Sequence, residues 1–73
     1  MYKVIALSES GLSIQDHLIK LGFSLTFPYY VRISERGGND NDGLPIVYKS
    51  DMEDSFENWI SLGHYIFEEI KQN

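Results

Sequence analysis

The hydrophobic pattern predicts a buried strand and a short helix in the first 22 residues. The run Tyr2–Leu7 is apolar on both of its faces, which is typical of a buried strand. Ser13 and Asp16 have the spacing of a capping box, and the apolar positions that follow them have helical spacing. Gly22 stands where a glycine often ends a helix. We therefore expect a helix of about two to three turns from Ser13 to Gly22.

A regular alternation of apolar and polar residues runs from Leu25 to Ser34 and predicts a strand with one buried and one exposed face. Pro28 has no backbone N–H to donate, so this strand is expected at a sheet edge or with a bulge. Residues 37–43 are rich in Gly, Asn and Asp and predict a loop. The run Leu44–Lys49 then predicts a third strand, which forms a hairpin with the one before it.

The last segment has an apolar stripe at helical spacing and predicts a helix over residues 52–71. In that helix Phe56 and Trp59 are expected to pack in the core rather than to cradle a ligand. Gly63 on the same face predicts close approach to a strand. The order is thus β-α-β-β-α. It predicts one α+β domain over residues 1–73, with two helices packed on one face of a three-stranded, mostly antiparallel sheet, whose central strand is either the first or the third.

Composition narrows the class of protein. A chain of 73 residues is expected to form a single domain. It has no cysteine, which excludes disulfides, thiolate metal sites and cysteine nucleophiles, and which fits a cytoplasmic location. No apolar run approaches the roughly 18 residues of a membrane span. Because so short a chain uses most of its apolar residues to fold, little is left to line a pocket. We therefore expect a protein that is not an enzyme.

The loop at residues 37–43 resembles a calcium loop in composition only. When Gly43 is aligned with the invariant glycine of an EF-hand, Asp40 and Asp42 fall on ligand positions. Gly38 then stands where the first aspartate is required, and Lys49 stands where the bidentate glutamate is required. The sequence therefore predicts a solvated loop and no metal site.

The two histidines and the first strand-to-helix loop do not form a metal or phosphate motif either. His17 and His64 are the two histidines, and neither has a second histidine at i+3 or i+4, as a helical zinc motif requires. The strand-to-helix loop Ser8–Gly11 has the position of a phosphate loop, but it contains no lysine and its Glu9 would repel phosphate. No cofactor is therefore expected.

The net charge of -5 is concentrated in the second half of the chain. Residues 1–39 carry a net charge of +1 and residues 40–73 carry -6. Solubility and the helix dipole account for part of this bias, and the remainder predicts an acidic binding surface. Its members are Asp40, Asp42, Asp51, Glu53, Asp54, Glu57, Glu68 and Glu69.

These features favour a non-enzymatic protein-binding module, an inhibitor or regulator that covers a basic surface of its partner. A nucleic-acid-binding protein is the expected kind of partner, because carboxylates can occupy its phosphate sites as a nucleic-acid mimic. The acidic composition argues against direct nucleic-acid binding. Small phage proteins that counter host defence have this size and charge, and the analogy rests on those two properties alone. Tyr30 and Arg32, on the exposed face of their strand, are expected as secondary contacts.

Two alternatives remain open from the sequence. A structural or oligomerising protein would form a homodimer through the edge strand Leu25–Ser34. A small ligand-binding domain is the weaker alternative. A roomy cleft that holds His17 or His64 beside a carboxylate would favour it.

Overall fold

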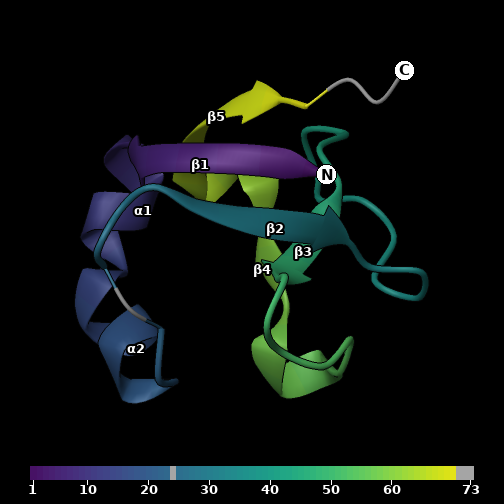
Figure 1. The fold of residues 1–73 in the computed structure, drawn as a ribbon, viewed down its shortest axis with the longest axis horizontal. Coiled ribbons are helices and arrows are strands. Elements are labelled where there is room, and N and C mark those ends of the chain that lie inside the picture. The colour runs from purple at the N-terminus through teal and green to yellow at the C-terminus, as the bar shows by residue number, and fades with distance from the viewer. Residues whose placement is uncertain (24, 71–73) are drawn as a thin grey trace.

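The computed structural model describes residues 1–23 and 25–70, and the strands of this part form one antiparallel sheet in the order β4-β3-β2-β1-β5 (Figure 1). The strands are β1 (Tyr2–Leu7), β2 (Tyr29–Ile33), β3 (Ile46–Lys49), β4 (Ile60–Ser61) and β5 (Tyr65–Glu69). The helical elements are α1 (Glu9–Ser13), α2 (Gln15–Lys20) and the 3₁₀ turns η1 (Phe56–Asn58) and η2 (Leu62–His64). The α+β class is as predicted.

The first strand is confirmed, but the helix after it begins earlier than predicted and is broken. Ser8 rather than Ser13 caps it, because the Ser8 side chain accepts the N–H of Gly11 directly after β1 ends. Ser13 is the last residue of α1, and Ile14 separates α1 from α2. Gly22 follows α2 with a φ of +91°, a left-handed conformation that favours glycine. The predicted end of the helical segment is therefore confirmed.

The strand predicted over residues 25–34 is not an edge strand. β2 lies in the middle of the sheet, paired with β1 on one side and with β3 on the other. It begins at Tyr29, directly after Pro28, so the proline is not required to donate a ladder hydrogen bond. The hairpin of β2 with β3 is confirmed. Because both sides of β2 are paired, the proposed homodimer through Leu25–Ser34 has no free strand edge to use.

The predicted helix over residues 52–71 is wrong. This segment forms η1, β4, η2 and β5, so the sheet has two more strands than expected in the described residues. In β5, which pairs with β1, Tyr65 is buried and Phe67 is partly buried, whereas Ile66 and Glu68 are exposed. Gly63 lies in η2 rather than on a helix. The predicted helix end at Lys71 lies outside the described residues.

The core fills the inner face of the sheet. Val4, Val31 and Val47 from the three central strands have no exposed surface. Leu18 of α2 and Phe23, which follows it, are also buried and belong to the same apolar cluster. The helical segment therefore packs on part of the inner face, and burial of these side chains is the main stabilising contribution to the fold.

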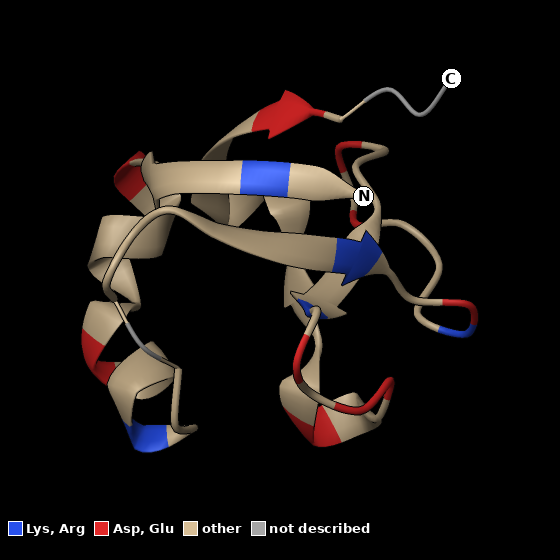
Figure 2. Ribbon diagram, in the orientation of Figure 1, with Lys and Arg blue, Asp and Glu red and all other residues tan. Residues whose placement is uncertain are grey.

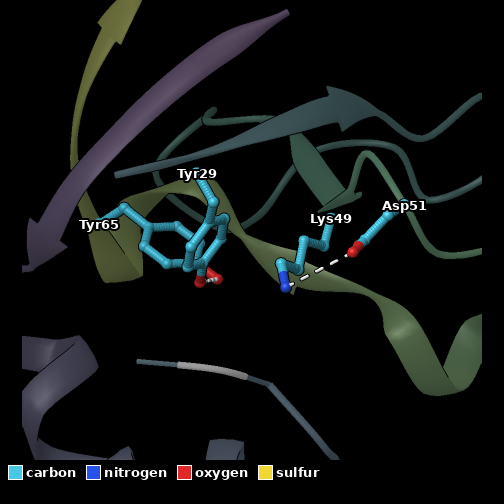
Figure 3. A network of polar contacts seen from close by, with 4 residues as sticks. All are labelled: Tyr29, Lys49, Asp51 and Tyr65. Carbon is cyan, nitrogen blue, oxygen red and sulfur yellow. Dashed lines mark hydrogen bonds and ion pairs between the residues drawn. The ribbon is translucent and has the colours of Figure 1, made fainter. Parts of the chain in front are cut away.

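Two buried tyrosines meet inside this core. Tyr29 of β2 donates its hydroxyl to the Tyr65 hydroxyl of β5 at 2.6 Å, with the rings edge to face (Figure 3). Burial raises the pKa of both phenols, so both stay neutral over the ordinary pH range. The Lys49 ammonium lies 5.1 Å from the centre of the Tyr29 ring. The contact between Tyr29 and Tyr65 thus links β2 and β5, which lie on the two sides of β1.

Replacing Tyr65→Phe removes the hydrogen-bond partner of a buried hydroxyl. The variant is expected to lose about 1–3 kcal/mol in the free energy of unfolding, because the Tyr29 hydroxyl stays buried and unsatisfied. The double variant Tyr29→Phe/Tyr65→Phe removes both polar groups and is expected to be less destabilised than the two single variants added together. Urea unfolding measures both quantities. Simple additivity would show that the bond contributes no coupling.

Candidate functional site

An apolar cleft of about 680 Å³ is bordered by two arms that project from the same side of the sheet (Figure 1). The helical arm is residues 9–21, with α1 and α2, and the second arm is residues 51–58, with η1. From the helical arm and its end, the cleft is lined by Ile14, Leu18 and Leu21; the opposite wall includes Phe56, Trp59 and Ile60. Its volume lies within the usual range of about 300–1,000 Å³ for ligand pockets. The expectation that little would be left to line a pocket is therefore wrong.

Phe56 stands at the rim of this cleft with 82% of its surface exposed. The prediction that it packs in the core is wrong, because residues 56–58 form a 3₁₀ turn on the projecting arm rather than a helix on the sheet. Its ring lies edge-on to Trp59 at 5.8 Å, and Trp59 is partly buried. On the opposite arm Leu21 is also 39% exposed. Apolar surface is thus left in water on both sides of the cleft.

The side chain of Asp54 fixes the second arm to the rest of the molecule. It accepts hydrogen bonds from the Ser34 hydroxyl at 2.7 Å, the Glu35 N–H at 3.0 Å and the Trp59 indole N–H at 2.7 Å. These bonds, with Ser34 the largest contributor, hold the pKa of Asp54 below its ordinary value. The Arg36 guanidinium also donates to the backbone carbonyl of Asp54 at 2.8 Å. Asp54 therefore has a structural role.

Asp40, in the loop between β2 and β3, has a similar internal role. Its carboxylate accepts the N–H groups of Asp42 and Leu44, each at 2.9 Å, and the hydroxyl of Ser61. The Ser61 bond is the largest reason that the pKa of Asp40 is lowered. These contacts close the loop before β3 and tie it to β4. Neither Asp40 nor Asp54 is therefore free to serve as a simple surface charge.

The remaining predicted acids lie in separate places, as the red segments of Figure 2 show. Asp51, Glu53 and Glu57 are exposed on the second arm, which is called the acidic arm from here on. Asp51 lies 3.7 Å from the Lys49 ammonium (Figure 3). The others are exposed on the loop before β3 or on β5: Asp42, Glu68 and Glu69. The eight acids do not share one helix face, and Glu57 is the one that lines the cleft.

Tyr30 and Arg32, which the sequence predicts as secondary partner contacts, lie apart from the cleft. In the sheet register Tyr30 pairs with Lys3 and Arg32 pairs with Tyr48. Because side chains alternate along a strand, these positions lie on the face opposite the buried Val31. Tyr30 and Arg32 are exposed there, as predicted, but they do not line the same cleft as Glu57.

Both histidines line the cleft, together with Glu57, although the sequence places them far apart. The packing of η2 against α1 brings His64 there, with its Nδ1 3.0 Å from the Ser10 hydroxyl oxygen. Burial lowers the pKa of His64, and the nearby Asp40 carboxylate opposes that shift. No local pattern in the sequence indicates this grouping, because it depends on a contact between residues more than fifty positions apart. The cleft thus holds both histidines and one carboxylate, which keeps the ligand-binding alternative open.

Comparison with known proteins adds no family or function: no family model, curated protein or solved structure matches the chain. Within residues 1–23 and 25–70, no group of three or more His, Cys, Asp or Glu side chains is placed to hold a metal ion. The helices of the same residues are all too short or too polar to cross a bilayer.

Acid should loosen the attachment of the acidic arm. The pKa of Asp54 is lowered in the folded protein, so its contribution to stability is present above the ordinary value of 3.8 and is lost as the pH falls through the folded value. Asp40 acts with the same sign. We expect the free energy of unfolding to be level at about pH 6 and to fall steadily below about pH 4. Urea unfolding from pH 6 to pH 2, followed by Trp59 fluorescence, measures this.

The substitution Asp54→Asn is expected to lower stability at pH 6 and to flatten its pH dependence, because the charged acceptor is removed. Asp42→Asn is the matched control, since it makes the same change at an exposed side chain of the loop before β3. An Asp54→Asn variant with the pH dependence of the wild type would contradict the structural role given to this carboxylate.

Proposed function

We propose that this protein is a non-enzymatic protein-binding module whose cleft and acidic arm recognise a basic segment of a partner. The observation that carries the proposal is Phe56, a large aromatic side chain held in water at the rim of an apolar cleft. A small domain has few apolar residues to spare, so an aromatic group outside the core suggests a binding role. The sequence predicted an inhibitor or regulator that covers a basic surface of its partner. The proposal narrows this to recognition of one basic segment by the cleft and the acidic arm.

The charge of the acidic arm gives the chemistry of the partner. Asp51, Glu53 and Glu57 are exposed on the arm that bears Phe56, and the whole chain carries a net charge of -5. Exposed charges of one sign attract a partner of the opposite sign and speed association, while the desolvated apolar contact supplies most of the affinity. A segment with a large apolar side chain flanked by Lys or Arg fits both parts of the site. Nucleic-acid-binding proteins are rich in such segments.

The arm is also prepared for binding before a partner arrives. The Asp54 carboxylate fastens it to Ser34 and Glu35 through two hydrogen bonds and accepts a third from the indole N–H of Trp59. A binding group that is already ordered loses less conformational entropy when the complex forms. This is why Asp54, although it belongs to the acidic set, supports the site without contacting the partner itself.

Selection of 12-residue peptides from a random library displayed on phage tests the proposal. The selected peptides are expected to combine a large apolar residue with two or more Lys or Arg residues. Phe56→Ala is expected to weaken the best peptide by about tenfold or more, which corresponds to 1.4 kcal/mol at the rim of the cleft. Fluorescence polarisation measures the affinity, and circular dichroism checks that the variant is folded.

Paired charge reversals separate the acidic arm from net charge in general. Glu53→Lys/Glu57→Lys changes the arm, and Glu68→Lys/Glu69→Lys makes the same change in net charge on β5. The first pair is expected to weaken the peptide by about tenfold and the second by less than about twofold at moderate salt. Equal effects of the two pairs, or selected peptides without basic residues, would show that the arm is not the recognition site.

Small-molecule binding is a second candidate, favoured by the two histidines and Glu57 in one cleft of ligand-pocket size. The two candidates differ in what fills the cleft. A fluorescent apolar probe such as anilinonaphthalene sulfonate, displaced by the selected basic peptide, would place the peptide in the cleft. A small metabolite that stabilises the wild type but not His17→Ala, in a chain that selects no peptide, would favour the second candidate.

A cytoplasmic location stays a prediction.

A further inference from the structure

One wall of the cleft is a strand at the edge of the sheet. β4 stands first in the order β4-β3-β2-β1-β5 and pairs with β3 in the described part of the chain. The cleft is lined by both Ile60 and Ser61. Successive side chains of a strand point to opposite faces of the sheet, so a cleft that touches both residues runs along the outer edge of β4.

The backbone hydrogen bonds show which groups this edge presents. Leu62, directly after β4, donates its N–H to the Pro45 carbonyl at 3.0 Å across the β3 side. Ile46, which stands opposite Ser61, accepts the Ser34 N–H at 2.9 Å on the far side of β3. Residues of an antiparallel pair alternate between bonding to each other and bonding outwards. The Ser61 N–H therefore points away from β3, towards the cleft.

The same alternation places an acceptor next to this donor. Ile60 stands opposite Val47, and its backbone groups face β3. The preceding carbonyl, that of Trp59, lies across a planar peptide from the Ile60 N–H and therefore points to the outer edge. Trp59 has φ -81° and ψ 138°, and Ser61 has φ -67° and ψ 136°, so both have extended backbone. One residue of an added parallel strand, opposite Ile60, would bond to both groups.

We infer that the partner segment binds in extended form and adds a strand to the outer edge of β4. This inference rests on the proposed function and states the conformation of the bound segment. Backbone bonds to Trp59 and Ser61 hold the segment, its apolar side chain enters the cleft between Leu18 and Phe56, and its basic residues face Glu57. The occupant is thus an extended basic peptide of another protein. A helical peptide or a small molecule would not use the edge.

Position 61 provides a test of the backbone contact. Ser61→Pro removes the outward N–H, and its φ of -67° is the value that proline requires. Ser61→Ala is the matched control. It keeps the N–H but loses the same two side-chain bonds, to Asp40 and from Gly63. With the best peptide from the phage library as the probe, Ser61→Ala is expected to bind within about threefold of wild type, and Ser61→Pro at least tenfold more weakly than Ser61→Ala.

A second measurement keeps the inference testable if Ser61→Pro does not fold. Amide hydrogen exchange of the wild-type protein, followed by NMR, is expected to show slower exchange at Ser61 when the peptide is bound. Equal peptide affinity for both Ser61 variants, or unchanged exchange at Ser61 in the saturated complex, would overturn strand addition and leave the proposed function standing. A library that yields no binding peptide would overturn the proposed function itself.

Discussion

The buried hydrogen bond between the Tyr29 and Tyr65 hydroxyls joins two strands of the sheet that do not pair with each other. β2 and β5 lie on opposite sides of β1, so these two side chains meet only across the intervening strand. Both phenols are buried, and each satisfies the other, which removes the cost of an unpaired polar group. Leu18 and Phe23 belong to the same buried cluster as the two tyrosines.

The small number of apolar residues in the chain explains why a cleft stays open between the two arms. One five-stranded sheet uses most of the apolar residues of the strands, and the helical segment covers only part of its inner face. The remaining apolar side chains lie where the arms face each other, which is why the cleft is lined by residues such as Leu21 and Phe56. In so small a domain a helix long enough to close this space would take residues from the sheet. The cleft therefore results from the division of the apolar residues between the sheet and the two arms.

The acidic residues divide into internal and external groups by their hydrogen bonds. Asp40 and Asp54 accept backbone N–H groups and side-chain donors, and each fixes a loop to a strand or turn. Glu53 and Glu57 remain exposed on the arm that Asp54 holds in place. Net charge alone does not separate these groups, because Asp and Glu have the same formal charge. The carboxylates that fix loops in place and those that stay exposed on the acidic arm are therefore different residues with the same side-chain chemistry.

The sequence by itself determined the first strand, the β2–β3 hairpin, the glycine after the helical segment and the location of the acidic charge. These features depend on local properties: alternation, turn residues, a left-handed glycine and the order of charged residues. Tertiary structure alone decided that residues 60–61 and 65–69 are strands. The apolar spacing of that segment suits a helix, but pairing of β5 with β1 supplies backbone hydrogen bonds and a buried row with Tyr65 and Phe67. The cleft, the exposed Phe56 and the free edge of β4 follow from this, because each depends on contacts between segments far apart in the chain.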